Sequence, residues 1–101
     1  MACKKKLTYN DLHRPIHSIH CFKDNILISV GCSAENSENA LEIYHNSATL
    51  TTPVKVLKTG AKAYRCFEPA VKLNAVLAIV GPNLVAIRIT ETFEIIKLGS
   101  W

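Results

Sequence analysis

The residues best suited to chemistry lie near the N-terminus, where His13, His17, His20 and Cys21 form the densest group of potential metal ligands. A zinc ion needs three or four such ligands within bonding distance. On a helix, His13 and His17 would share one face. Pro15 and the β-rich residues after it instead favour an extended strand, on which His20 and Cys21 point to opposite sides. We therefore expect no metal site here, but a packed Cys21 beside exposed histidines.

Two groups of basic residues are candidates for binding nucleic acid. The first is a run of three lysines close to the N-terminus, and the second is a short stretch in which an aromatic residue stands between two cations. Cations neutralise phosphates, and an aromatic ring can stack on a base. A solvated N-terminal arm and ordinary strand packing explain the same residues without a ligand. The candidates are Lys4, Lys5, Lys6, Lys62, Tyr64 and Arg65.

The sequence contains no recognisable catalytic or cofactor motif. Its four glycines stand singly after apolar runs, so none belongs to a loop that cradles phosphate. Glu35, Glu38 and Glu42 lie in or beside a polar stretch and are expected to be solvated. Cysteine–histidine catalysis needs a third orienting group, and the apolar surroundings of Cys66 predict burial. We therefore expect a protein that is not an enzyme and that binds no cofactor.

Length and composition describe one globular domain. The chain has 101 residues, of which 49% are apolar and 20% charged, with 12 Lys+Arg against 8 Asp+Glu and a net charge of +4. Such a composition is typical of folded rather than disordered chains. Its longest apolar run, residues 75–80, is too short to span a membrane, so no membrane association is predicted.

The start of the chain and the cysteines together predict a cytoplasmic protein. The basic start is followed by polar residues where a signal peptide would have an apolar core. Thiols are normally reduced inside cells. Cys21, Cys32 and Cys66 lie in apolar stretches, so we expect them to be small core residues.

Eight short apolar runs predict the elements that position these residues. They have the usual length of strands, alternate in polarity or are apolar throughout, and are separated by turn residues such as Gly31, Gly60 and Pro69. An all-β, antiparallel fold follows. The runs are residues 16–22, 25–30, 40–45, 54–58, 63–68, 75–80, 84–89 and 93–98.

The eight runs form two similar halves. Residues 25–31 align with 75–81, residues 39–44 with 83–88, and residues 56–60 with 95–99. This alignment matches Leu41 with Val85 and Ile43 with Ile87. The repeat length is close to that of a four-stranded propeller blade. We expect a basic N-terminal arm (1–15) and a β domain (16–101) with blade-like units at 16–60 and 61–101. A small β-sandwich or barrel is the alternative.

These residues resemble those of WD-repeat β-propellers, with entry, inner, amphipathic and outer strands in that order. The Gly-His and Trp-Asp signatures are absent, and Trp101 is the last residue. The segments at 25–31, 41–44, 60–67 and 77–81, followed by a closing Trp101, are similar to the N-terminal part of the WD-repeat subunit of tRNA ribose 2′-O-methyltransferase complexes. This likeness covers residues 16–101 and rests on short apolar patterns.

The resemblance implies a non-catalytic, propeller-type scaffold that mediates protein–protein interaction within a tRNA-modification complex. Two blades do not close a ring, because propellers have typically four to eight. The implied partners are therefore another protein or the remaining propeller blades, with tRNA reached through the methyltransferase. The alternative function is a small basic β-domain that binds nucleic acid directly.

Overall fold

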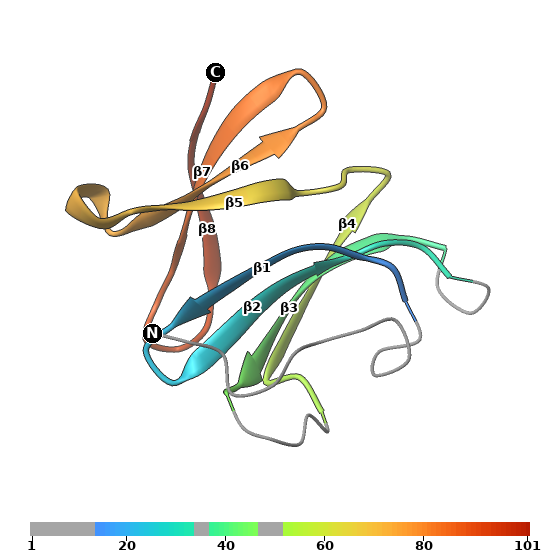
Figure 1. Cartoon of the computed structure of the whole chain (residues 1–101), viewed down its shortest axis with the longest axis horizontal. Coiled ribbons are helices and arrows are strands. Elements are labelled where there is room, and N and C mark those ends of the chain that lie inside the picture. Colours follow the sequence, from blue (N-terminus) through green and yellow to red (C-terminus); the bar gives the residue numbers. More distant parts are fainter. Residues whose placement is uncertain (1–13, 34–36, 47–51) are drawn as a thin grey trace.

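The computed structural model describes residues 14–33, 37–46 and 52–101 and is all-β in this part of the chain. Lys4, Lys5 and Lys6, with His13, lie outside the described residues. Eight antiparallel strands follow one another along the chain, with a short 3-10 turn, η1 (Val71–Leu73), after the fifth (Figure 1). The strands are β1 (Ile16–Phe22), β2 (Asn25–Val30), β3 (Asn39–His45), β4 (Lys55–Gly60), β5 (Arg65–Ala70), β6 (Ala75–Val80), β7 (Asn83–Ile89) and β8 (Ile95–Ser100).

The eight predicted strands are confirmed. β1, β2 and β6 have the predicted bounds, whereas β4, β5 and β8 begin and end slightly later. Pro69 was expected to break a strand but lies inside β5. β5 tolerates it because it is an edge strand whose pairing with β6 is irregular between Arg65 and Glu68.

The strands form two four-stranded antiparallel sheets that do not close into a barrel. The first sheet has the order β1-β2-β3-β4 and the second the order β5-β6-β7-β8. Figure 1 shows the two sheets crossing at an angle, with β1 and β5 running beside each other. A hydrogen bond joins these two strands, because the Phe67 N–H donates to Ser18 Oγ at 2.9 Å.

One apolar core lies between the two sheets. Leu27, Leu41 and Ile43 of the first sheet are fully buried against apolar residues of β6 and β7. Aliphatic side chains removed from water in this way are the main stabilising contribution to such a fold. The members on the second sheet are Val76, Val80, Val85 and Ile87.

The far face of the first sheet is buried as well. Ile26, Ile28 and Val30 have no exposed surface and pack with Ala40 and Tyr44 in a second apolar cluster. Both faces of the central strands β2 and β3 are therefore withdrawn from water, which explains why β2 is apolar at nearly every position, whereas Val56 and Leu57 of the edge strand β4 are exposed.

A charged network lies on this far face, and it corrects the expectation that Glu42 is solvated. Glu42 is buried in β3, accepts a hydrogen bond from Tyr44 Oη at 2.8 Å, and lies 3.7 Å from the Arg14 guanidinium. Arg14 also donates to the carbonyls of Gly31 at 2.8 Å and Glu38 at 2.5 Å. Arg14, assigned to the N-terminal arm, is thus fixed to the first sheet.

The internal repeat is real in the first three strands of each sheet, but the alignment of β3 with β7 was wrong by one residue. Ser29 pairs with Leu41, and the equivalent Ile79 pairs with Leu84. Leu41 therefore corresponds to Leu84, not to Val85. The sequence misleads here because both strands contain an asparagine near the start and aliphatic residues at every second position.

The cysteine predictions were also wrong. Cys21 is disulfide-bonded rather than reduced, and it is only partly buried beside the cluster on the far face. Cys32 and Cys66 are free thiols at exposed positions, not core residues. Cys32 lies beyond the end of β2, next to Ser33, and Cys66 lies in the edge strand β5 at a positive φ of 57° where the pairing with β6 is irregular.

Candidate functional site

The outer face of the second sheet is an exposed apolar surface, here called the open face. Leu77 pairs with Ala86, Ile79 with Leu84, and Ile96 with Arg88, so these side chains share the side turned away from the first sheet. Ile79, Leu84 and Ile96 are 40%, 37% and 44% exposed. Their counterparts facing the inter-sheet core, such as Leu41, are completely buried.

Trp101 extends the open face. Its N–H donates to the Leu84 carbonyl at 2.8 Å and its carbonyl accepts from the Leu84 N–H at 2.9 Å, which continues the ladder beyond β8. The indole lies over Gly99, where a Cβ would approach the ring to 3.0 Å. At 69% exposed, Trp101 presents the largest apolar side chain of this surface to water.

One end of the open face is rigidly braced. Arg88 donates from Nε to the Asn74 carbonyl at 3.1 Å and from Nη2 to the Leu73 carbonyl at 2.7 Å. Asn74 ends η1 in the left-handed region, with φ 49°. The guanidinium thereby fixes the β5–β6 connection to β7. This end of the open face is already ordered, which reduces the conformational entropy lost when a partner binds.

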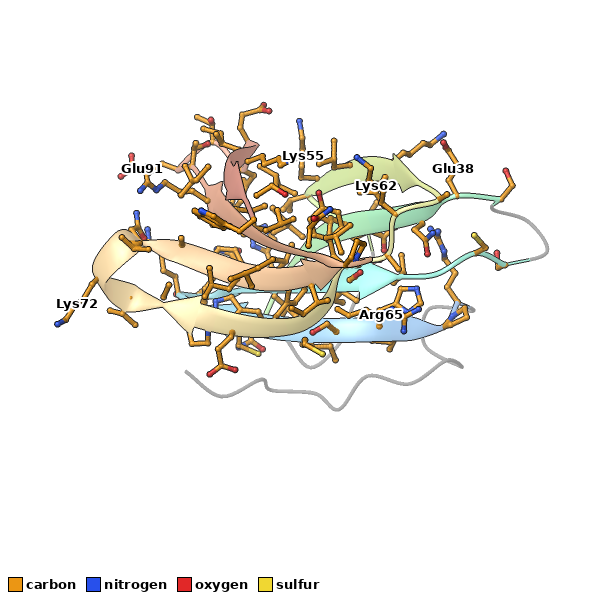
Figure 2. All side chains as sticks on the ribbon, turned by 90° about the horizontal axis from the view of Figure 1, so that it is seen from above. Glu38, Lys55, Lys62, Arg65, Lys72 and Glu91 are labelled. Atoms are coloured by element: carbon orange, nitrogen blue, oxygen red, sulfur yellow. The ribbon has the colours of Figure 1, made fainter. Side chains whose placement is uncertain are left out.

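The predicted nucleic-acid residues Lys62, Tyr64 and Arg65 come together in a hollow of about 420 Å³ beside the second sheet. The segment that joins β4 to β5 lines one side, and the β6–β7 turn with the end of β8 lines the other. Lys97 of β8 is a third cation of this basic hollow. Figure 2 labels Lys62 and Arg65 in this part of the molecule, far from Lys72 at the β5–β6 connection.

Tyr64 takes a structural part in this arrangement. Its ring packs against the inter-sheet core, and the side chain is half-buried. Burial raises the pKa of the Tyr64 phenol above its usual value. The ring thus contributes to the core and also lines the basic hollow, where the exposed cations are the groups most open to a ligand.

Sequence reasoning missed Lys97 and the open face. Lys97 reaches the hollow only through the pairing of β7 with β8, which sets Lys97 opposite Ile87. No local pattern connects it with Lys62. The alternation of β7 did indicate two distinct faces, but it did not indicate which face the first sheet would cover.

The histidines of the metal-ligand group have other contacts. His17 Nε2 lies 3.1 Å from Asn39 Oδ1, and the His20 ring stacks on Phe22 with centroids 5.9 Å apart. Burial lowers the pKa of His20. Within residues 14–33, 37–46 and 52–101, no group of three or more His, Cys, Asp or Glu side chains could hold a metal ion. That same part of the chain contains no helix long and apolar enough to cross a membrane.

No family model matches the chain, and no curated protein or solved structure is significantly similar to it.

Proposed function

We propose that this protein is a non-catalytic scaffold whose open face docks a β-sheet presented by a partner protein. The observation that carries this proposal is the equivalence of two sheet faces. Leu27 and Leu41 on the first sheet correspond by register to Leu77 and Leu84 on the second. The first pair is covered by a neighbouring sheet, and the second pair forms the centre of the open face.

The molecule itself supplies the example of what covers such a face. In the inter-sheet core, aliphatic residues of β2 and β3 pack against Val76, Val85 and Ile87, which protrude from a second antiparallel sheet. Two sheets pack in this way when their apolar faces are complementary. A partner sheet with a similar aliphatic face would bury Ile79 and Leu84 by the same contacts.

The composition of the open face also suits a protein partner. A contiguous apolar surface that remains exposed is typical of interaction sites. Tryptophan and arginine are enriched among the residues that contribute most to binding energy. Trp101 and Arg88 occupy those roles here, around aliphatic residues that exclude water.

The resemblance to the WD-repeat subunit makes a tRNA ribose 2′-O-methyltransferase the partner to test first. In this proposal the methyl-transfer site lies on the methyltransferase, and this chain contributes binding surface only. Its open face takes the place at which a propeller blade meets its neighbour.

The test compares the wild-type chain with Ile79→Asp and with Val71→Asp as the matched control. Both residues are exposed aliphatics, but Val71 lies in η1, outside the open face. Mixing each purified chain with a purified methyltransferase should give a stoichiometric complex for the wild type and the control, with affinity reduced at least tenfold for Ile79→Asp. A charge buried in an apolar contact without a partner accounts for this loss.

Three results would contradict the proposal. One is equal binding by Ile79→Asp and the control, which would move the contact away from the open face. Another is the absence of any complex with the methyltransferase. The third is self-association of the purified chain that Ile79→Asp abolishes, since this would identify a second copy as the occupant.

A further inference from the structure

The basic hollow has a one-sided charge. Its lining includes Lys62, Arg65 and Lys97, together with the polar Asn83 and Ser100, and among the described residues it includes no Asp or Glu. A second hollow of about 360 Å³ near the first sheet is also lined by charged residues, but there Arg14 and Lys58 are accompanied by Glu38 and Glu42. The cations of the second hollow are therefore partly neutralised, whereas those of the basic hollow have no carboxylate beside them.

We propose that the basic hollow binds the phosphate backbone of a single-stranded nucleic acid. Three cations on a concave surface create a positive potential that attracts a polyanion. A phosphopeptide offers one phosphate, while a nucleic-acid strand offers a phosphate to each cation in turn. The net charge of +4 acts in the same direction. Binding phosphate here is a function beyond that of a protein-docking scaffold.

The three cations of the hollow come from different elements. Lys97 pairs with Ile87, which belongs to the inter-sheet core, so its side chain leaves β8 on the side of the first sheet. Lys62 lies on the connecting segment next to β5. Arg65 pairs with Ile79 and emerges toward the open face. All three line the hollow, so a variant without Lys62 and Lys97 retains Arg65 as its one remaining lining cation among the described residues.

The geometry favours contact with phosphates and not with bases. The Tyr64 ring lines the hollow but is half-buried against the inter-sheet core, whereas Lys62, Arg65 and Lys97 are exposed. Stacking on aromatic rings is the usual source of base contacts in sequence-tolerant strand binding. The hollow therefore treats RNA and DNA alike and is insensitive to base sequence.

The salt dependence of binding tests this inference. Filter binding of uridine and thymidine homo-oligomers to the wild-type chain should give equal affinities for RNA and DNA. Three phosphate contacts predict a log–log salt slope of about −2, hence a loss of about 20-fold between 50 and 200 mM salt. Lys62→Ala with Lys97→Ala should reduce the slope to about −0.7 and weaken binding at 50 mM salt at least tenfold.

The matched control is Lys58→Ala with Lys72→Ala, which removes two exposed lysines outside the basic hollow. This variant has the same net charge as the first and retains the same N-terminal lysines. Because the cations of the basic hollow are unchanged, it should keep most of the affinity and the slope. An equal loss of affinity in both double variants would show that the oligonucleotides are bound by the overall positive charge and not by the basic hollow. Absence of binding at 50 mM salt, or a phosphoserine peptide that binds more tightly than the oligonucleotides, would overturn the inference. Circular dichroism of each variant confirms that it is folded.

Discussion

The two sheets share the pairing of their first three strands, yet they differ in how many of their faces are covered. In the first sheet, the central strands β2 and β3 are buried on both sides, by the inter-sheet core and by the cluster around Ile26 and Ile28. The second sheet is buried on one side and exposes Ile79 and Leu84 on the other. Equivalent residues of the two sheets are therefore buried or exposed according to whether another sheet lies against their face. The residues of the first sheet that correspond to the open face are ordinary core residues.

The largest expected effect concerns the equivalent leucines Leu41 and Leu84. Leu41→Ala should lower the free energy of unfolding by about 2–5 kcal/mol, because it leaves a cavity between the sheets. Leu84→Ala should cost about 1 kcal/mol or less, since more than a third of that residue is already in contact with water. Urea denaturation followed by circular dichroism measures both values. Equal losses would show that Leu84 lies in a core and that the two sheets do not differ as described.

A smaller effect concerns Ser29, the counterpart of Ile79. Its hydroxyl is buried between the sheets without a hydrogen-bond partner in the described structure. Ser29→Ala removes this unsatisfied group and should stabilise the protein by about 1 kcal/mol. Ser18→Ala is the control, because its hydroxyl accepts from the Phe67 N–H and its loss should destabilise. Destabilisation by Ser29→Ala would reveal a partner for the hydroxyl.

The third effect concerns pH and the far face of the first sheet. Burial, the hydrogen bond to Glu42 and the charge of that carboxylate raise the pKa of Tyr44 well above 10. Above pH 10 the unfolded phenol loses its proton while the folded one keeps it, so stability falls as pH rises. By pH 10.5 this linkage lowers the stability of the wild type by at most about 0.8 kcal/mol.

Tyr44→Phe should remove this part of the alkaline slope. Tyr64 also has a raised pKa and contributes to the alkaline slope of both proteins. The contribution of Tyr44 is therefore the difference in slope between the wild type and the variant. Thermal unfolding at pH 9 and pH 10.5 provides the comparison. Parallel losses in the two proteins would show that Tyr44 is not linked to folding in this way.

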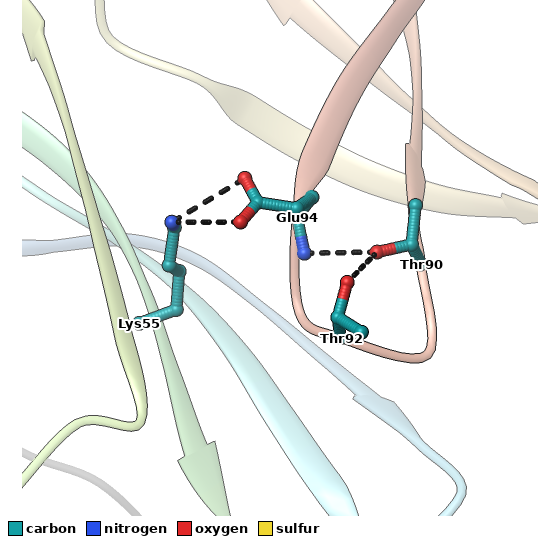
Figure 3. A network of polar contacts seen from close by, with 4 residues as sticks. All are labelled: Lys55, Thr90, Thr92 and Glu94. Atoms are coloured by element: carbon teal, nitrogen blue, oxygen red, sulfur yellow. Dashed lines mark hydrogen bonds and ion pairs between the residues drawn. The ribbon is translucent and has the colours of Figure 1, made fainter.

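The smallest effect concerns an ion pair that connects the two sheets. Lys55 Nζ of β4 lies 3.3 Å from Glu94 Oε1 in the β7–β8 turn, where the Glu94 N–H donates to Thr90 Oγ1 (Figure 3). Because both charged groups are exposed, Lys55→Ala should cost no more than about 0.5 kcal/mol, and less at high salt. Lys58→Ala serves as the control on the same strand. A loss above 2 kcal/mol would mean that the sheets depend on this contact.

Much of the fold was predictable from the sequence because strands and turns are local. Continuous apolar runs at β2 and β6 marked strands, and single glycines marked their ends, but the burial that such a run indicates holds for β2 and not for β6, where Ile79 is exposed. The face that each side chain occupies was less predictable. A shift of one residue exchanges the two faces of a strand, and the similar aliphatic patterns of β3 and β7 concealed such a shift.

The candidate sites depend on contacts between distant residues, so the sequence indicated them only in part. Lys62, Tyr64 and Arg65 are neighbours in the chain, and the structure keeps them together. Lys97 joins them only because β8 pairs with β7. The buried pair of Arg14 and Glu42 was not predictable either, because Arg14 precedes β1 and Glu42 lies in β3, and no local pattern connects the two residues.

Trp101 gives the open face a built-in optical reporter. It is the only tryptophan of the chain, and its indole is largely exposed. Its emission therefore comes from one known place and should shift to shorter wavelength when a bound sheet replaces the surrounding water. Occupancy of the open face can thus be followed by intrinsic fluorescence, without a label and without altering the surface that is being measured.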